Sequence, residues 1–483
     1  MKLPDHKTRI VATIGPASDS PGMLERLVRA GLDIARLNFS HGAFEEHAGR
    51  IGRIRAAAEA AGRPVTIMAD LPGPKMRLGR IDPEPIQLKA GDVFVLTTEE
   101  ISGDNRRASM SFERLPAVVK AGDRLFLNDG LVQMEVERVE GADVRCKVVV
   151  GGELRSRKGL NLPGINLGIS AFTEHDRACL EFALKHGVDA VSQSFVETAD
   201  DIRAVREAAR ELGRRPFVIA KIERSGAIEN FDSILGAADG IMVARGDLGV
   251  EVPIQEIAIL QKDLIARANL AGKPVIVATQ MLESMVSSRL PTRAEATDAA
   301  NAILDGADCL MLSAESAMGK FPEESVAMLA GIAASTESRR PPSRLRDLQS
   351  LSLGHKPSSA PEAIALVVEH ALETVPCGAV FVPTRGGTTA RMLSRFKPAP
   401  WIVAVCSDPA VCRGLGFSYG VQAVQAASEP PDWRGYAKEW MERHGVGGAV
   451  AFLVAGPSAA NPDANHRIEF MKVGEFPGRP GAT

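Results

Sequence analysis

Short apolar runs, each ending at polar residues, recur along the N-terminal part of the chain, and between most of them lie longer stretches with the hydrophobic spacing of amphipathic helices. The runs cover residues 9–15, 32–39, 64–70, 188–195, 216–223, 239–247, 274–280 and 308–315. Nearly continuous apolar strands that alternate with helices are typical of a parallel sheet covered on both faces. Eight βα units close such a sheet, so the pattern predicts a TIM barrel.

Signals at the helix ends support these units. The clearest helical stretches are 44–62, 173–187, 199–213 and 254–272. Each ends at glycine, the residue preferred just beyond a helix C-terminus. Thr292 and Glu295 have the spacing of a capping box, and Thr173 with Asp176 has the acidic variant of that spacing.

The alternation is interrupted once, between the third strand and the helix expected near Thr173. The interruption contains period-two stretches separated by Gly and Asp turns, which predicts a small β-barrel inserted in a βα loop. Beyond Arg340, a polar, Pro- and Ser-rich stretch indicates a linker, and the apolar strands that follow predict a compact α/β domain. The expected division is a barrel at 1–71 and 166–340, an inserted lid at 72–165, and a C-terminal regulatory or oligomerisation domain at 341–483.

Composition excludes several classes of protein. The 483 residues are 45% apolar with a net charge of −3, which suits a soluble globular chain and offers no basic surface for nucleic acid. The start has no apolar signal-peptide core, and no apolar stretch is long enough to span a membrane. We therefore expect a cytoplasmic protein without nucleic-acid or membrane partners. The six scattered cysteines include no CxxC pair and predict buried free thiols rather than a zinc site.

In a TIM barrel, the catalytic residues lie at the C-terminal ends of the strands. Six strand ends here carry chemically capable residues, namely Arg36, Asn38, Ser40, His41, Asp70, Lys221, Glu223, Arg245, Gly246, Asp247, Thr279, Gln280, Ser313 and Glu315. Glu223 and Asp247, from neighbouring strands, can share a hard divalent cation such as Mg²⁺. Lys221 lies on the same face of its strand as Glu223, so its ammonium can spread negative charge during phosphoryl transfer or enolate formation.

Each of these residues also has a purely structural interpretation. A single charged residue at a strand end is often a helix cap or a surface ion pair, and Arg245-Gly246-Asp247 can form an ordinary turn. Six such ends in one barrel favour an active site. The sequence has no GxxxxGK[ST] motif and no GxGxxG that opens a helix after a strand, so a bound nucleotide is held in another way.

Six long motifs occur in a specific order: RLNFSHG (36–42), KGLNLPG (158–164), AKIE (220–223), RGDLGVE (245–251), ATQMLESM (278–285) and PTRAEATDAANAILDGADCLMLSAES (291–316). Together they resemble the pyruvate kinase family, and the resemblance covers the whole chain. It implies a homotetrameric phosphotransferase that uses Mg²⁺ or Mn²⁺. Such an enzyme moves the phosphoryl group of phosphoenolpyruvate to ADP, giving pyruvate and ATP in the last step of glycolysis.

The same resemblance implies roles for individual residues. Arg36 binds the phosphoryl group of the substrate and Lys221 stabilises that group during transfer. Thr279 lies where enolpyruvate is protonated, and Ser313 and Glu315 belong to the network that delivers the proton. The remaining implied roles are substrate-carboxylate binding by Gly246, Asp247 and Thr279, metal binding by Glu223 and Asp247, and nucleotide binding by Arg77, Lys158 and His41.

The family's potassium site matches Asn38, Ser40, Asp70 and the Leu71 carbonyl. Potassium-dependent relatives have glutamate at the position of Lys75, and this change is accompanied by others in the segment Asp70-Leu71-Pro72-Gly73-Pro74-Lys75. An ammonium and a potassium ion are both compact monovalent cations that suit oxygen ligands. The resemblance therefore predicts that Lys75 replaces the ion and that potassium is not required; a Lys75 turned outward to solvent is the alternative.

A phosphorylated effector is implied for the loop that contains Thr384, Gly387, Thr388 and Thr389. Gly386 stands where the family usually has serine, so a plain strand-to-helix turn is the alternative. Gln193, where a small residue is usual, and Ala314 are further departures from the family pattern. None of the departures removes a charged catalytic group, which favours an active enzyme over a silent metabolite sensor. A Mg²⁺-enolate lyase on a related barrel is a second alternative, but it would not need the inserted lid or Lys158.

Overall fold

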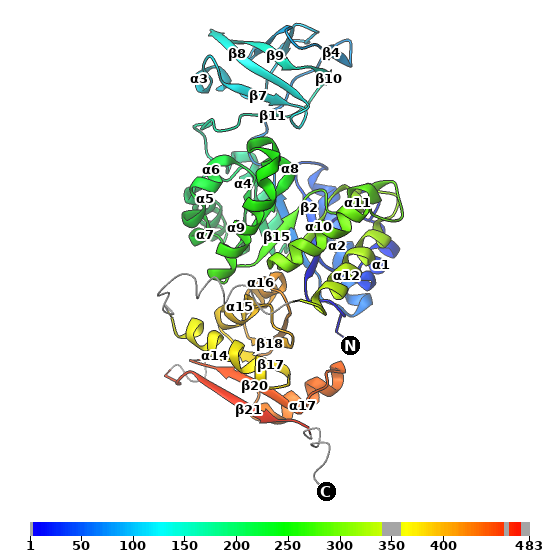
Figure 1. The fold of residues 1–483 in the computed structure, drawn as a ribbon, viewed down its shortest axis with the longest axis vertical. Helices are drawn as coiled ribbons and strands as arrows, with labels where there is room; N and C mark the ends of the chain where they lie inside the picture. The colour runs from blue at the N-terminus through cyan, green and yellow to red at the C-terminus, as the bar shows by residue number, and fades with distance from the viewer. Residues whose placement is uncertain (1–2, 341–358, 458–462, 475–483) are drawn as a thin grey trace.

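The computed structural model describes residues 3–340, 359–457 and 463–474, which form three stacked parts (Figure 1). An all-β part lies at one end, an α/β barrel in the middle and a second α/β part at the other end. Most of the linker expected beyond Arg340 lies outside the described residues.

The predicted TIM barrel is confirmed as a closed sheet of eight parallel strands in the order β1-β16-β15-β14-β13-β12-β3-β2. The strands are β1 (Arg9–Thr13), β2 (Leu32–Asn38), β3 (Thr66–Leu71), β12 (Ala190–Gln193), β13 (Phe217–Ile222), β14 (Gly240–Ala244), β15 (Val275–Ala278) and β16 (Cys309–Leu312). Seven of them lie within one apolar run each, and β3 extends one residue beyond its run, to Leu71. The runs are apolar on both strand faces because one face fills the barrel interior and the other packs under the helices.

The helices around the barrel are α1 (Pro21–Ala30), α2 (Phe44–Ala61), α4 (Glu174–Lys185), α5 (Ala199–Glu211), α6 (Ser225–Glu229), α7 (Phe231–Ala237), α8 (Arg245–Glu251), α9 (Ile257–Leu270), α10 (Arg293–Asp305), α11 (Ala314–Ala317) and α12 (Pro322–Glu337). Short 3₁₀ turns, η1 (Ile254–Glu256) and η2 (Glu283–Val286), precede α9 and α10. Both predicted capping boxes are present, with the hydroxyls of Thr173 and Thr292 accepting hydrogen bonds from the amides of Asp176 and Glu295. These caps fix where the helices begin after the strands.

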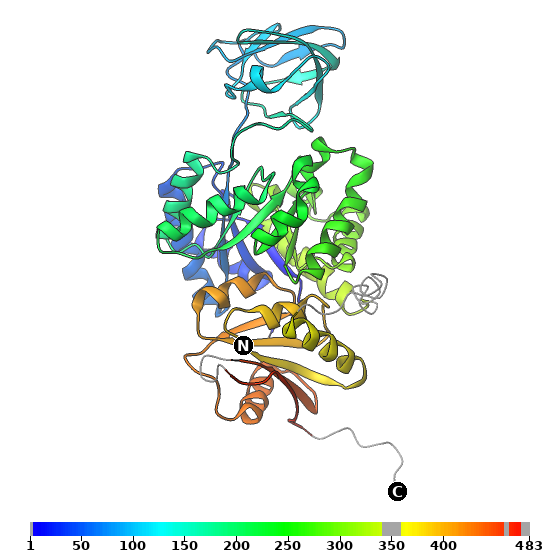
Figure 2. The same cartoon turned by 90° about the vertical axis from the view of Figure 1, so that its left-hand side faces the viewer.

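The inserted part consists mainly of β-strands, as expected, with one short helix. It contains β4 (Ile86–Leu88), β5 (Val93–Thr97), β6 (Arg107–Ser109), α3 (Leu115–Val118), β7 (Arg124–Leu127), β8 (Val132–Glu140), β9 (Asp143–Val150), β10 (Gly152–Leu154) and β11 (Leu160–Asn161). Six of the strands form a sheet in the order β11-β7-β8-β9-β5-β6, around a hydrophobic core of their own. Two chain segments connect this lid to the barrel (Figure 2).

At one of these connections, the chain turns sharply at Gly73, whose φ of 65° favours glycine. Its N–H donates to Asp176 Oδ1 at 2.9 Å, and a Cβ atom at this position would lie 2.9 Å from the ring of Phe195. Glycine is therefore required where the chain leaves β3 for the lid.

The C-terminal part is an α/β sheet in the order β19-β18-β17-β20-β21, with only β21 antiparallel to its neighbour. Its elements are α14 (Ala360–Thr374), β17 (Cys377–Pro383), α15 (Thr388–Ser394), β18 (Trp401–Cys406), α16 (Pro409–Gly414), η3 (Leu415–Phe417), β19 (Val421–Gln425), α17 (Trp433–His444), β20 (Val450–Ala455) and β21 (Arg467–Lys472). Phe417 reaches the interior core of the barrel and stacks on Phe217 with ring centroids 5.0 Å apart. The C-terminal part thus closes the end of the barrel opposite the lid.

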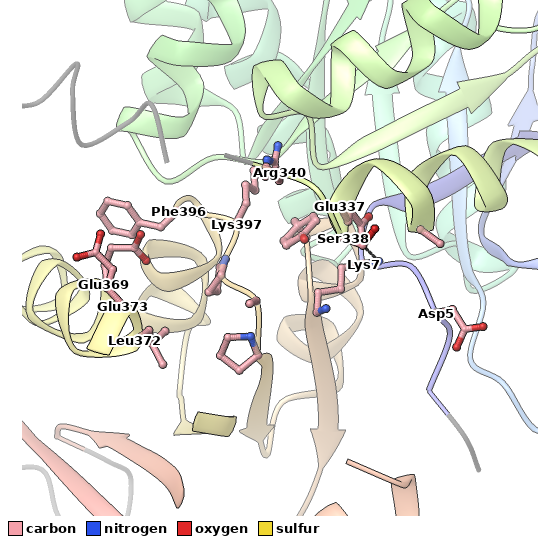
Figure 3. A pocket seen from close by; sticks show the side chains of 15 residues that line it. Asp5, Lys7, Glu337, Ser338, Arg340, Glu369, Leu372, Glu373, Phe396 and Lys397 are labelled. Atoms are coloured by element: carbon pink, nitrogen blue, oxygen red, sulfur yellow. Dashed lines mark hydrogen bonds between the residues drawn. The ribbon is translucent and has the colours of Figure 1, made fainter. Parts of the chain in front are cut away.

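A cavity of about 680 Å³ lies beside this junction, lined by residues of both parts (Figure 3). The carboxylate of Glu337 there accepts hydrogen bonds from the backbone amides of Lys7 and Thr8, at 2.8 and 2.7 Å. Lys397 forms an ion pair with Asp308 at 2.6 Å. The hydrogen bonds of Glu337 therefore tie α12 to the N-terminal segment, and the ion pair of Lys397 ties the C-terminal part to the barrel.

The prediction of free thiols is wrong for two of the six cysteines. Cys406 at the end of β18 and Cys412 in α16 form a disulfide, with Cα atoms 6.1 Å apart. The helix folds back onto the strand that precedes it, which brings two residues without a CxxC spacing into disulfide range. Of the other cysteines, Cys146, Cys179 and Cys309 are buried and free, and Cys377 is free and partly buried.

In the part of the chain that the structure describes, no helix combines the length and the apolar composition needed to cross a bilayer.

Candidate active site

A cavity of about 400 Å³ lies at the C-terminal ends of the barrel strands, where the lid is attached. The barrel contributes Arg36, Asn38, Ser40, His41, Asp70, Ser194, Phe195, Lys221, Glu223 and Asp247 to its lining, and the lid side contributes Lys75, Met76, Arg77, Asp129, Arg157, Lys158, Gly159, Leu160 and Asn161. Most of the residues singled out at the strand ends thus face one space.

Arg36 and Asp70 form a buried ion pair on neighbouring strands. The Nε and Nη2 atoms of Arg36 donate to Asp70 Oδ2 at 3.1 and 2.5 Å, and Nη1 donates to the hydroxyl of Thr13 at 2.8 Å. Ser192 donates to the other oxygen of Asp70 at 2.6 Å. Burial would raise the pKa of Asp70, but the cations Lys221 and Arg36 and the hydrogen bonds outweigh burial, so the pKa is lowered. Asp70 therefore holds the Arg36 guanidinium in a fixed orientation.

Lys221 continues this row of charges. Its Nζ lies 3.1 Å from Glu223 Oε2 and 3.7 Å from Asp70 Oδ2, and it donates to the hydroxyl of Ser194 at 2.7 Å. Burial alone would lower the pKa of Lys221, but the carboxylates of Asp70, Glu223 and Asp247 raise it to about 12. The side chain is a fixed cation at the floor of the cavity. We refer to Arg36, Asp70, Lys221 and Glu223 as the charge cluster.

Glu223 has the features of a metal ligand. The side chain is 2% exposed, and Oε1 accepts a hydrogen bond from the backbone N–H of Phe195 at 2.6 Å. Oε2 is buried and accepts no hydrogen bond from the described residues, although Lys221 is close. Burial raises the pKa of Glu223, and the nearby carboxylates of Asp247 and Asp70 add to the rise. A divalent cation at Oε2 would complete the coordination of this oxygen and favour the ionised form.

Asp247 lies in the first turn of α8, is exposed and lines the same cavity. Among residues 3–340, 359–457 and 463–474, no three His, Cys, Asp or Glu side chains are grouped to hold a metal ion. Two carboxylates fit a Mg²⁺ site of the kind that keeps several positions for water and substrate oxygens. The donor set therefore fits a divalent metal that is held jointly with the substrate.

Thr279 and Gly246 contact each other beside the cavity. The N–H of Gly246 donates to Thr279 Oγ1 at 2.7 Å, and that hydroxyl donates to the carbonyl of Ala278 at 2.6 Å. Thr279 has a φ of 70°, which is uncommon for a β-branched residue. Arg245 stabilises this conformation, since its Nη2 donates to the Thr279 carbonyl at 2.8 Å while its Nη1 pairs with Asp298. The strained threonine is thus held at a strand end, where strain often accompanies function.

Ser313 and Glu315 lie together at the end of β16, and they are not among the described residues that line the cavity. Glu315 is fully buried and its two oxygens accept hydrogen bonds from the backbone amides of Leu282 and Ser313, at 3.1 and 2.7 Å. In this arrangement, Glu315 fixes the loops that follow β15 and β16.

Lys75 is partly buried, lines the cavity and reaches the loop that follows β2 rather than pointing outward to solvent. Its Nζ donates to the carbonyl of Ser40 at 2.8 Å, and the Ser40 amide donates to the side chain of Asn38 at 3.0 Å. Partial burial and the neighbouring Arg77 lower the pKa of Lys75, against smaller opposing effects of Cys179 and Asp176. The ammonium therefore contacts one of the four residues that the family resemblance assigns to potassium, and that residue is in turn bonded to a second, Asn38.

The three candidate nucleotide-binding residues all line the cavity. Arg77 and Lys158 lie on the two antiparallel segments that join lid and barrel, where the Arg77 guanidinium donates to the carbonyl of Arg157 at 3.1 Å. Partial burial lowers the pKa of His41, and the cations Lys75, Arg77 and Arg36 lower it further. The mouth of the cavity is consequently basic.

The candidate effector loop connects β17 to α15. Thr384 Oγ1 accepts a hydrogen bond from the Gly387 N–H at 2.9 Å, and Gly387 has a φ of 79° directly before the helix. One of the backbone amides expected to bind a phosphate is therefore paired within the loop.

Several residues that contact the charge cluster were not singled out from the sequence. Ser192 and Ser194 alternate with Gln193 at the end of β12 and bind Asp70 and Lys221, and Thr13 on β1 binds Arg36. The period-two spacing of the two serines in the fourth apolar run was the signal that could have identified them.

Comparison with known proteins agrees with the resemblance read from the motifs. Residues 5–326 match the family model described as pyruvate kinase, barrel domain, and residues 362–447 match the one described as pyruvate kinase, alpha/beta domain. The pyruvate kinase of Thermococcus litoralis is 51% identical over 425 residues, which are 87% of this chain and 89% of that protein. The pyruvate kinase of Geobacillus stearothermophilus is 42% identical over 423 residues, 87% of this chain and 72% of that one. A crystal structure of a pyruvate kinase from Cryptosporidium parvum superimposes with a TM-score of 0.90 at 35% identity, covering 97% of this chain and 96% of that chain.

Proposed function

Because this chain belongs to the pyruvate kinase family, we propose that it is a phosphotransferase that moves the phosphoryl group of phosphoenolpyruvate to ADP, giving pyruvate and ATP. The observation that carries the proposal is the charge cluster, in which two buried cations and two buried carboxylates converge on one cavity. Such preorganised charges are suited to stabilising the charge that develops on a transferring phosphoryl group.

In the proposed mechanism, Arg36 binds the phosphoryl group of phosphoenolpyruvate. Asp70 and Thr13 hold its guanidinium, so little reorganisation is needed when the substrate arrives. Lys221, held by Ser194, donates to the phosphoryl oxygens as the bond to the enolate oxygen breaks and the bond to the ADP oxygen forms. Fixed donors of this kind lower the barrier because their charges are already oriented before the reaction.

Glu223 and Asp247 would hold the divalent metal, Mg²⁺ or Mn²⁺. When bound, the metal would neutralise negative charge on the substrate and the transferring group. Oε2 of Glu223 supports this assignment, because it is buried beside Lys221 and accepts no hydrogen bond from the described residues. Gly246, Asp247 and Thr279 are proposed to seat the carboxylate of the substrate, which requires the Gly246 amide to exchange its hydrogen bond to Thr279 for one to the ligand.

After transfer, the enolate must be protonated on carbon. We assign Thr279 to the face where the proton arrives, with Ser313 and Glu315 behind it in the delivery network. The positions of these residues support the assignment. β15 and β16 are adjacent, and Glu315 links the loops that follow them. Arg77, Lys158 and His41 are assigned to the nucleotide at the lid side of the cavity, where their positive charges suit its phosphates.

Independence from potassium is part of the proposal. The ammonium of Lys75 donates to the Ser40 carbonyl at 2.8 Å, and Ser40 is one of the four residues assigned to potassium, which supports this assignment. A covalently attached cation occupies that position at any salt composition, because no free ion has to be recruited. A homotetramer, a cytoplasmic location and a phosphorylated effector at the loop of Thr384, Gly387, Thr388 and Thr389 also stay predictions.

A coupled assay tests the central proposal. The purified full-length chain is given phosphoenolpyruvate, ADP and Mg²⁺, and pyruvate is followed through its reduction with NADH by lactate dehydrogenase. We expect pyruvate formation that requires ADP and Mg²⁺ and that produces an equal amount of ATP. Turnover of phosphoenolpyruvate without ADP would point to a lyase or hydrolase, and binding of phosphoenolpyruvate without turnover would point to a silent sensor.

A further inference from the structure

Gln193 is a buried polar side chain that the proposed mechanism does not use. It is fully buried as the last residue of β12, in register with Leu71 of β3 and Ala220 of β13. Side chains alternate between the two faces of a strand. The hydroxyls of Ser192 and Ser194 bind Asp70 and Lys221, so Gln193 faces away from the cavity.

The amide group of Gln193 makes two hydrogen bonds, both from Nε2. One goes to the carbonyl of Ser194 at 3.0 Å and the other to the carbonyl of Ala171 at 2.8 Å, in the segment that returns from the lid. Its Oε1 is buried and accepts no hydrogen bond from the residues that the structure describes. A fully buried amide with one unsatisfied oxygen is costly, which suggests that the bonds from its nitrogen serve a purpose.

The carbonyl of Ser194 and the N–H of Phe195 belong to the same peptide unit. While the carbonyl accepts from Gln193, the N–H donates to Glu223 Oε1 at 2.6 Å. A peptide unit is planar, so fixing the direction of its C=O also fixes the direction of its N–H. The Gln193 amide therefore acts on Glu223 through one rigid group.

This peptide needs external support. Phe195 has a φ of 60°, in the left-handed region that non-glycine residues rarely adopt. Conformations of this kind are unfavourable and persist only where the surrounding contacts hold them. The bond from Gln193 Nε2 to the Ser194 carbonyl is one such contact, directly on the strained turn.

From this geometry we infer that Gln193 is a positioning residue, which orients Glu223 for metal binding through the Ser194–Phe195 peptide and links that peptide to the return segment of the lid. The inference rests on the proposed function, because the role of Glu223 as a metal ligand is part of that proposal. Gln193 does not touch substrate or metal; its effect is on where the Glu223 carboxylate points.

The test measures Mn²⁺ binding to the full-length protein in the absence of substrates, by the electron paramagnetic resonance signal of the free ion. Gln193→Met keeps the length and apolar stem of the side chain but cannot donate a hydrogen bond. Loss of groups that orient a metal ligand typically weakens metal binding about 10- to 100-fold, and we expect an effect of that size. A crystal structure of Gln193→Met should show the Ser194–Phe195 peptide rotated away from Glu223.

Asn269→Leu is the matched control. Asn269 is also a buried amide that donates to one backbone carbonyl, that of Gly306 at 3.0 Å, and whose oxygen accepts no hydrogen bond in the described part of the chain. It lies in α9 and is not among the described residues that line the active-site cavity. Asn269→Leu should lower the melting temperature as Gln193→Met does and leave Mn²⁺ affinity unchanged.

Glu223→Gln tests the metal role of Glu223 separately from the positioning role of Gln193, and it should abolish Mn²⁺ binding. If Glu223→Gln abolishes binding while Gln193→Met binds with wild-type affinity, the positioning role is overturned and the proposed function stands. Equal weakening by Gln193→Met and Asn269→Leu also overturns it, because the effect is then one of general stability. If Glu223→Gln binds Mn²⁺ normally, the assigned metal role of Glu223 fails and the inference fails with it.

Discussion

Replacement of Lys75 by glutamate tests whether an ammonium takes the place of potassium. Nζ of Lys75 donates to the Ser40 carbonyl at 2.8 Å, in the cavity that Asn38 and Asp70 also line. A hydrogen bond to a charged group contributes about 1.5–3 kcal/mol, and each 1.36 kcal/mol of transition-state stabilisation changes the rate about tenfold. If the cation stabilises the transferring phosphoryl group from this position, Lys75→Glu should lower kcat about 10- to 100-fold in potassium-free buffer.

The assay compares potassium chloride with tetramethylammonium chloride at constant ionic strength, so that the screening of surface charges is the same in both salts. The wild type should have the same kcat in both. Lys75→Glu should recover activity in potassium, because the new carboxylate and the neighbouring oxygens can then bind the ion. Lys75→Met, which removes the cation without adding a ligand, should be slow in both salts. A wild-type enzyme that loses activity without potassium would refute the reasoning, as would a Lys75→Glu variant that potassium does not restore.

Three further predictions concern the mechanism, the lid and the effector loop. Lys221→Met should lower kcat by about 10² to 10³, the effect of removing one preorganised donor, with a smaller change in phosphoenolpyruvate binding measured by calorimetry; near-normal turnover would contradict its role. Addition of phosphoenolpyruvate, Mg²⁺ and a non-reactive ADP analogue should bring the lid toward the barrel and reduce the radius of gyration in small-angle X-ray scattering, because closure excludes water from the phosphoryl group. Identical scattering with and without ligands would argue against closure. Titration with phosphosugars and nucleoside monophosphates should lower the phosphoenolpyruvate concentration at half-maximal rate for at least one compound, and Thr388→Glu should abolish that response. If no compound has an effect, the loop of Gly387 and Thr388 is only a turn.

The barrel could be predicted from the sequence because buried parallel strands produce a local signal. Each of the eight apolar runs contains one barrel strand, except that β3 extends one residue beyond its run, and most of the polar residues named at the run ends line one cavity. The capping boxes at Thr173 and Thr292 could also be predicted from the sequence, because a capping box is formed by two residues three positions apart. These features depend on short stretches of chain, so a single sequence contains them.

Features that depend on how one element folds against another could not be predicted in this way. The disulfide of Cys406 and Cys412 forms because α16 folds back on β18, and the sequence spacing alone does not show that return. The two bonds of Gln193 join it to Ala171 and to its own neighbour, and only the strand register and the path of the chain from the lid reveal them. The departure at Gln193 was visible from the sequence, but its structural consequence was not.

The charge cluster also gives a physical reason for the proposed role of the lid. Arg36 and Lys221 are offset by Asp70 and Glu223, so the four side chains together carry no net charge when all are ionised. Their arrangement provides directed donors, but a neutral group has little long-range attraction for a substrate with several negative charges. In the proposed mechanism, the additional positive charge comes from the divalent metal and from Lys75, Arg77 and Lys158. Arg77 and Lys158 lie on the segments that join lid and barrel. Closure of the lid would therefore complete the electrostatic environment of the phosphoryl group as well as exclude water, and the position of the lid should affect catalysis more than it affects the fold of the barrel.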